Sequence, residues 1–141
     1  MGVKTRLTNK GIISYRTDGT DTSGDRGFGA GADRAQGTVS ASTALTPDQA
    51  GSHILSSSSA LSVPMPVASS SPGSRWVFRC GSAHAHVLIS GSAETTARPF
   101  TDGTDNGGQV ALENVVGSSV VLMSDGANWI VLGNSGSLTL S

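Results

Sequence analysis

Residues 120–132, VVLMSDGANWIVL, decide the fold. Two apolar runs, each long enough for a β-strand, flank the pair Asp125 and Gly126. Asp-Gly favours a tight turn between strands, because glycine adopts the positive φ that such turns require. The stretch therefore predicts a β-hairpin, with Asn128 hydrogen-bonded to the backbone of the turn. Trp129 follows the turn and is expected to close one end of the core, since a buried tryptophan removes roughly 200 Å2 from water.

The composition around this hairpin predicts an all-β protein. The chain has 141 residues, of which 36% are hydrophobic and 13% charged, and its net charge is −1. Small polar residues fill the difference, and helix-forming Lys, Glu and Gln are scarce. Runs of Val, Ile and Leu exclude a disordered charged tail. No apolar stretch approaches the ~18 residues of a transmembrane helix, so no membrane contact is expected.

Residues 37–141 are expected to form a compact antiparallel β-sandwich or barrel, similar to a jelly roll. Short strand candidates separated by turn residues are typical of these folds. Thr46–Gly51 is expected to form one turn of helix, with Thr46 as N-cap and Pro47 in the first position. The strand candidates are residues 38–45, 53–55, 60–64, 75–80, 85–90, 109–114, 119–124, 129–132 and 137–140.

Few bulky side chains are available to fill a core. Among the six aromatic residues, Trp76, Phe78 and Trp129 are expected to be buried, together with Leu122 of the hairpin. The single cysteine, Cys80, excludes an internal disulfide and a zinc site built from thiols. It lies in a strand candidate and is expected to act as a small buried apolar side chain.

Residues 1–36 are expected to form an extended, basic and glycine-rich N-terminal arm, which would span up to about 120 Å if fully stretched. Residues 3–17 alternate loosely and are expected to form a strand only against a partner sheet. The first sixteen residues carry four cations and no acid, which fits either nucleic acid or an acidic protein surface. The arm residues expected to bind a partner are Lys4, Arg6, Lys10, Arg16, Arg26 and Phe28.

No catalytic motif emerges from the sequence, and no cofactor is expected. The chain has no Gly-x-Ser-x-Gly nucleophile turn. Glu94 and Glu113 could form a pair of acids, but both adjoin turns and are expected to lie on the solvated surface. The oxygen-rich segment 102–108 could hold a hard cation, and a turn is the preferred interpretation.

His84 and His86 are the only pair with metal-ligand spacing. Residues i and i+2 of a strand face the same side, so three chains around an axis would supply six ring nitrogens. Two ligands per chain are too few without that symmetry. The preferred interpretation is therefore two half-exposed histidines beside a turn, and no metal site.

Five segments, in order, carry a resemblance to a domain of bacteriophage virion proteins. They are ALTPDQAG at 44–51, LSVPMP at 61–66, GSRWVFR at 73–79, VLISG at 87–91 and GSSVVLMSDGANW at 117–129. Together they resemble the β-domain of head decoration (cement) proteins, tail fibres and tailspikes. The resemblance covers residues 43–133, and the last motif is the most specific. Ser118, His84 and His86 depart from the pattern.

This resemblance implies a homotrimeric structural protein of the virion. The preferred hypothesis is a decoration protein on the phage head, which binds the major capsid protein through its arm and its β-domain. The alternative is a tail-fibre or tailspike component that binds a host surface glycan. In both cases the chain is expected to be made in the host cytoplasm, since no signal peptide is present, and to bind no nucleic acid and catalyse no reaction.

Overall fold

The computed structural model describes residues 3–8, 11–16 and 37–141. The chain divides into two compact units, Met1–Ala35 and Gln36–Ser141, each of which is considered by itself. In the part of the chain that is described, no helix has both the length and the apolar character needed to cross a membrane.

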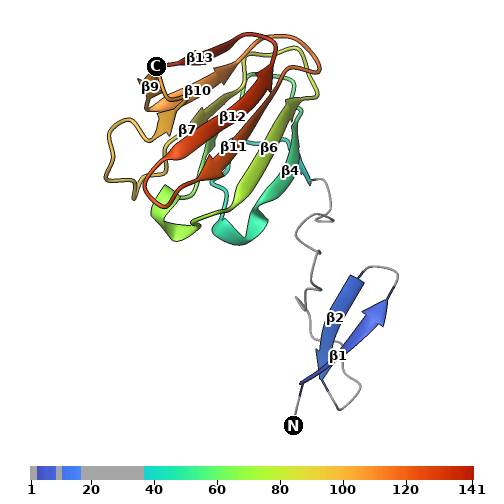
Figure 1. Ribbon diagram of the computed structural model, residues 1–141. Helices are drawn as coiled ribbons and strands as arrows, with labels where there is room; N and C mark the ends of the chain where they lie inside the picture. The colour runs from blue at the N-terminus through green and yellow to red at the C-terminus, as the bar shows by residue number, and fades with distance from the viewer. Residues whose placement is uncertain (1–2, 9–10, 17–36) are drawn as a thin grey trace. The chain divides into compact units, whose positions relative to one another are not determined.

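The first unit contains a two-stranded antiparallel sheet. Strand β1 (Val3–Thr8) pairs with β2 (Gly11–Arg16) along its whole length, from Val3 opposite Arg16 to Thr8 opposite Gly11 (Figure 1). The expectation that residues 3–17 form a strand only against a partner sheet is therefore wrong. The two halves of this segment have equal length, so each satisfies backbone groups of the other.

The second unit consists of two mixed sheets and is all-β, as predicted. The larger sheet has the order β3-β4-β6-β11-β12-β8-β9 and the smaller one the order β13-β10-β7-β5. Two single turns of 3-10 helix, η1 (Pro47–Gln49) and η2 (Ala68–Ser70), accompany them. The strands are β3 (Gly37–Val39), β4 (Gly51–Leu55), β5 (Ser62–Pro64), β6 (Arg75–Cys80), β7 (Val87–Ile89), β8 (Phe100–Thr101), β9 (Asn106–Gly107), β10 (Gln109–Leu112), β11 (Ser119–Ser124), β12 (Trp129–Ser135) and β13 (Leu138–Leu140).

From β4 to β7, successive strands alternate between the two sheets. β4 and β6 lie side by side and parallel in the larger sheet, and β5 and β7 do the same in the smaller sheet. A chain that crosses to the opposite sheet and returns arrives in its original direction, which is how a β-solenoid winds. The predicted antiparallel jelly-roll-like sandwich or barrel is therefore wrong for these strands, because strand direction depends on pairings between distant residues.

The predicted hairpin is present as β11 and β12. Ser124 pairs with Trp129 across the turn, and Gly126 has a φ of +95°. The carboxylate of Asp125 accepts the N–H groups of Ala127 at 2.8 Å and Asn128 at 2.6 Å. Asp125, and not the Asn128 side chain, therefore supplies the hydrogen bonds to the turn backbone. The same two N–H groups, Asn128 first, lower the pKa of Asp125.

The helical turn expected at Thr46–Gly51 is also present, as η1. Pro47 occupies its first position, and the backbone N–H of Thr46 donates to the Gln49 side chain at 2.8 Å.

Cys80, at the end of β6, is fully buried, as expected of a small apolar side chain.

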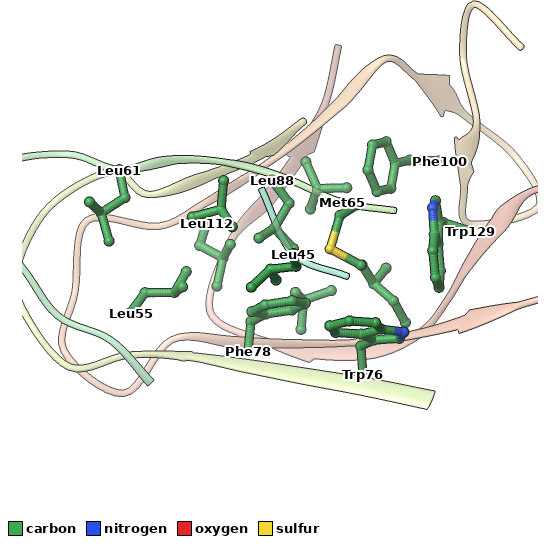
Figure 2. Close-up of a cluster of buried hydrophobic side chains, with 14 of the residues drawn as sticks. Leu45, Leu55, Leu61, Met65, Trp76, Phe78, Leu88, Phe100, Leu112 and Trp129 are labelled. Atoms are coloured by element: carbon green, nitrogen blue, oxygen red, sulfur yellow. The ribbon is translucent and has the colours of Figure 1, made fainter. Parts of the chain in front are cut away.

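The core lies between the two sheets, and Trp76 and Trp129 lie at one end of it (Figure 2). Trp76 stacks on Phe78 with ring centres 6.1 Å apart, and meets Trp129 edge to face at 6.1 Å. The indole N–H of Trp129 donates to the carbonyl of Pro66 at 3.2 Å, which joins the hairpin to the segment after β5. Leu122 is also fully buried. All four side chains predicted for the core are therefore in it.

Trp129→Ala is expected to lower the free energy of unfolding by about 3–5 kcal/mol, the range typical of large aromatic truncations in cores. The cause is a cavity beside Trp76 and the loss of the bond to Pro66. Urea unfolding followed by circular dichroism measures the change. The control is Leu132→Ala on the same strand, where the side chain is 49% exposed and the loss should stay within about 0.5 kcal/mol. A loss below about 1 kcal/mol for Trp129→Ala would contradict the assigned role of the indole.

Candidate functional site

The N-terminal sheet carries three of the six residues predicted to bind a partner. Lys4 and Arg6 lie on β1, and Arg16 ends β2. The register places Lys4 opposite Tyr15. The sheet has only two strands, so β1 and β2 each keep one edge that no other described strand occupies. The other three predicted residues, Lys10, Arg26 and Phe28, lie outside the described residues.

His84 and His86 do not project from a strand, since both precede β7. His86 is fully buried and His84 is half-buried, so the prediction of two half-exposed histidines is wrong for His86. Their rings are 6.1 Å apart and inclined at 73°. The strand pattern failed here because the chain turns from Gly81 until just before β7.

Both ring nitrogens of His86 are used within the chain. The backbone N–H of Leu61 donates to Nδ1 at 3.1 Å, so Nδ1 carries no proton. Nε2 therefore carries the ring proton and donates to the Ser82 hydroxyl at 3.1 Å. A metal would have to displace one of these bonds. Among the described residues, no three His, Cys, Asp or Glu side chains come together as a metal site.

Burial lowers the pKa of His86, and the neighbouring His84 lowers it further. The neutral ring is the form that accepts from Leu61 and donates to Ser82. His86 is therefore a structural histidine, which holds the start of β5 and the loop before β7 together.

The two glutamates are structural hydrogen-bond acceptors. Glu94 accepts the backbone N–H of Ala68 at 3.1 Å, as well as two N–H groups of its own loop. Glu113 accepts the N–H of Ser137 at 2.9 Å. Both side chains are half-buried. The expectation of a solvated surface is therefore only partly met, because each carboxylate joins segments that are distant in sequence.

Within the oxygen-rich segment 102–108, residues 102–105 form the turn that the sequence favoured, and β9 occupies the next two positions. Asp102 Oδ1 accepts the N–H groups of Thr104 and Asp105, each at 2.8 Å. These bonds, the one from Asp105 first, lower the pKa of Asp102. This oxygen is thus committed to the turn backbone.

An apolar groove of about 530 Å3, a volume within the range of ligand pockets, lies beside the smaller sheet. Sequence analysis missed this groove, because three segments distant in sequence line it. None of its lining residues is charged, and the larger ones are Leu45, Pro47, Pro64, Met65, Pro66, Val67 and Ile89.

Residues 37–141 expose no aromatic ring. Trp76, Phe78, Phe100 and Trp129 are all 0% exposed. Sugar-binding sites commonly stack a pyranose on an exposed ring, which these residues do not offer.

Neither the known protein families nor the curated proteins include a match for this chain.

Acidification is expected to destabilise the domain through His86. The folded state lowers the pKa of this side chain below its ordinary value of 6.5, so the unfolded chain binds the proton first. The stabilisation is complete above about pH 7 and is lost as the pH falls through the folded-state pKa. Urea unfolding at pH 7.5 and pH 5 measures this loss.

His86→Asn is the matched variant, because its side-chain oxygen can accept from Leu61 and does not titrate. Its stability should fall less between the two pH values than that of the wild type. The two proteins differ at residue 86 alone, so the difference between their losses is assigned to this side chain. Equal losses in the two proteins would show that His86 is not the cause.

Proposed function

We propose that this protein is a decoration, or cement, protein of a bacteriophage head, which attaches to the major capsid protein on the outer surface of the virion. The observation that carries the proposal is the two-stranded sheet at the N-terminus. β1 and β2 form a unit apart from the β-domain, and each strand keeps an edge free of described partners. The resemblance of residues 43–133 to phage virion domains supplies the biological setting.

The charge of this sheet suits an acidic protein partner. Lys4, Arg6 and Arg16 are cationic, and neither strand contains an acid. An isolated two-stranded sheet is at best marginally stable in water. A free edge on a capsid protein would add a third strand by main-chain hydrogen bonds, with carboxylates beside it matching the cations. This mode of attachment needs no catalytic chemistry.

The β-domain supports a scaffolding role. His86, Glu94 and Glu113 are engaged in hydrogen bonds that hold its loops. The sequence also has no nucleophile motif. These groups therefore serve the stability of the domain, and we assign the protein no enzymatic activity and no cofactor.

We also propose that three copies associate through the outer face of the smaller sheet. The strand residues on this face alternate with buried ones, and none is charged. Depletion of charge is typical of the centre of protein interfaces. The face consists of Ser62, Pro64, Val87, Ile89, Gln109, Ala111 and Thr139.

The alternative, a tail-fibre or tailspike component that binds a host glycan, has less support. It would favour an exposed aromatic ring near Asp or Asn, and residues 37–141 expose none. Glycan binding by a tail component is therefore the alternative that the host-cell arm of the binding experiment tests.

The purified full-length protein is expected to co-sediment with undecorated heads of the parent phage, saturating at a fixed ratio to the capsid lattice. Lys4→Glu combined with Arg6→Glu should weaken this binding by roughly tenfold or more, as charge reversal at an interface does. The matched control exchanges Lys4→Arg and Arg6→Lys, which keeps both charges and should bind nearly as well as wild type. A parallel assay uses host cells. Binding to cells and not to heads would overturn the proposal in favour of the tail component.

A further inference from the structure

The outer face of the larger sheet has a distinct composition. In β6 the side chains of Trp76 and Phe78 point into the core, so Arg75, Val77 and Arg79 occupy the outer face. Both arginines are exposed and Val77 is half-buried. These three residues and their outward-facing neighbours on β4, β11 and β12 form the Arg75/Arg79 face.

Strand register extends this face with apolar side chains. Across β11, Met123 lies next to Arg75, Val121 next to Val77 and Ser119 next to Arg79. On the other side of β6, β4 places Ile54 next to Arg79. β12 continues the face with Ile130, which pairs with Met123. The two arginines therefore flank a strip of half-buried aliphatic side chains.

A β-bulge raises the apolar exposure at one side of the strip. The register between β11 and β12 shifts between Val121 and Leu122, so Leu132 has no partner of its own. Its side chain is 49% exposed, and it is one of three exposed large hydrophobic side chains in residues 37–141. Bulges re-aim side chains in this way at functional surfaces.

The charge on this face is opposite to that of the rest of the domain. Residues 37–141 contain three arginines and six carboxylates, apart from the chain end. Two of the arginines lie on the Arg75/Arg79 face, whereas no strand of the larger sheet contains an acid. An acidic surface would attract this face and repel most of the others.

Neither arginine is used within the described part of the chain. No described residue accepts a hydrogen bond from the guanidinium of Arg75 or Arg79 or forms an ion pair with it, whereas Arg98 donates to the carbonyl of Asn106 at 3.4 Å. Guanidinium groups pair with carboxylates through two parallel hydrogen bonds, and arginine is enriched in protein interfaces. No described residue therefore competes with an external partner for these two groups.

We propose that the Arg75/Arg79 face is a second capsid-binding surface, which docks on an apolar patch of the capsid protein bordered by carboxylates. This inference rests on the proposed function and adds a contact made by the β-domain itself. The two guanidinium groups fix the orientation of the domain on the lattice, and the strip around Val77 and Val121 is removed from water on docking. The N-terminal sheet and this face then hold the same molecule at two places.

The test compares full-length variants in co-sedimentation with undecorated heads. Arg75→Glu combined with Arg79→Glu should lower the affinity by roughly tenfold or more, the effect typical of residues central to an interface. The matched control for charge compares the single reversals: Arg75→Glu and Arg79→Glu should each weaken binding, whereas Arg98→Glu, with the same change of charge, should change the affinity by less than about threefold. Arg75→Lys combined with Arg79→Lys should restore binding only in part, since lysine cannot bind a carboxylate through two parallel hydrogen bonds. Circular dichroism and tryptophan fluorescence confirm that each variant is folded.

The outcomes separate this inference from the proposed function. If wild type binds heads and the Arg75/Arg79 reversal binds equally well, the face is not a capsid contact and the proposed function stands. If the reversal instead changes the oligomeric state in sedimentation without heads, the face joins copies of this chain and the inference is overturned. If wild type does not bind heads, both proposals fail.

Discussion

The aromatic contacts of Trp76 are the interaction on which the domain depends. The indole stacks with His53 of β4 and with Phe78 of its own strand, which also stack on each other, and it meets Trp129 of the hairpin edge to face. The Trp76 side chain thus contacts aromatic rings from β4, β6 and β12, in a domain with only four Phe, Trp or Tyr residues. Trp129 in turn donates a hydrogen bond to the carbonyl of Pro66, which follows β5, the edge strand of the smaller sheet. The outer faces of the two sheets of this domain, on which two of the proposed binding surfaces lie, take their geometry from these contacts.

Local signals explain which parts of the fold could be predicted. Two apolar runs around Asp125 and Gly126 fix a hairpin, and 75–80 alternates over its whole length, so β6 and β11 were placed at their observed bounds. The predicted second strand of the hairpin, 129–132, begins where β12 does but ends three residues before it, because Gly133, Asn134 and Ser135, which lack apolar side chains, continue the pairing. β8 and β9 were missed, because two-residue strands carry no periodicity. The parallel winding of β4 to β7 was missed for another reason: alternation shows which side chains are buried and says nothing about the direction of the neighbouring strand.

The candidate surfaces show the same limit. The cations of the N-terminal segment are visible in the sequence, whereas their arrangement on paired strands is not. Arg75 and Arg79 were counted as charges only, because their common face appears when β6 is placed between β4 and β11. His86 had metal-ligand spacing and is instead a buried acceptor, since Leu61, 25 residues away, supplies its partner. The sequence thus shows which charged and histidine side chains are present. The pairing of distant segments determines which of them are buried and which share an exposed face.

The alternation of strands between sheets also determines the order in which the chain folds during synthesis. β6 is paired on one side by β4, which precedes it, and on the other by β11, which begins at Ser119. While the ribosome makes the intervening residues, the second edge of β6 has no partner, and Trp76 lacks its contact with Trp129. Open strand edges and uncovered aromatic rings are the features by which nascent chains associate with one another. Translation that pauses before the hairpin would therefore favour aggregation. The core of this small domain closes only after β11 and β12 have been synthesised.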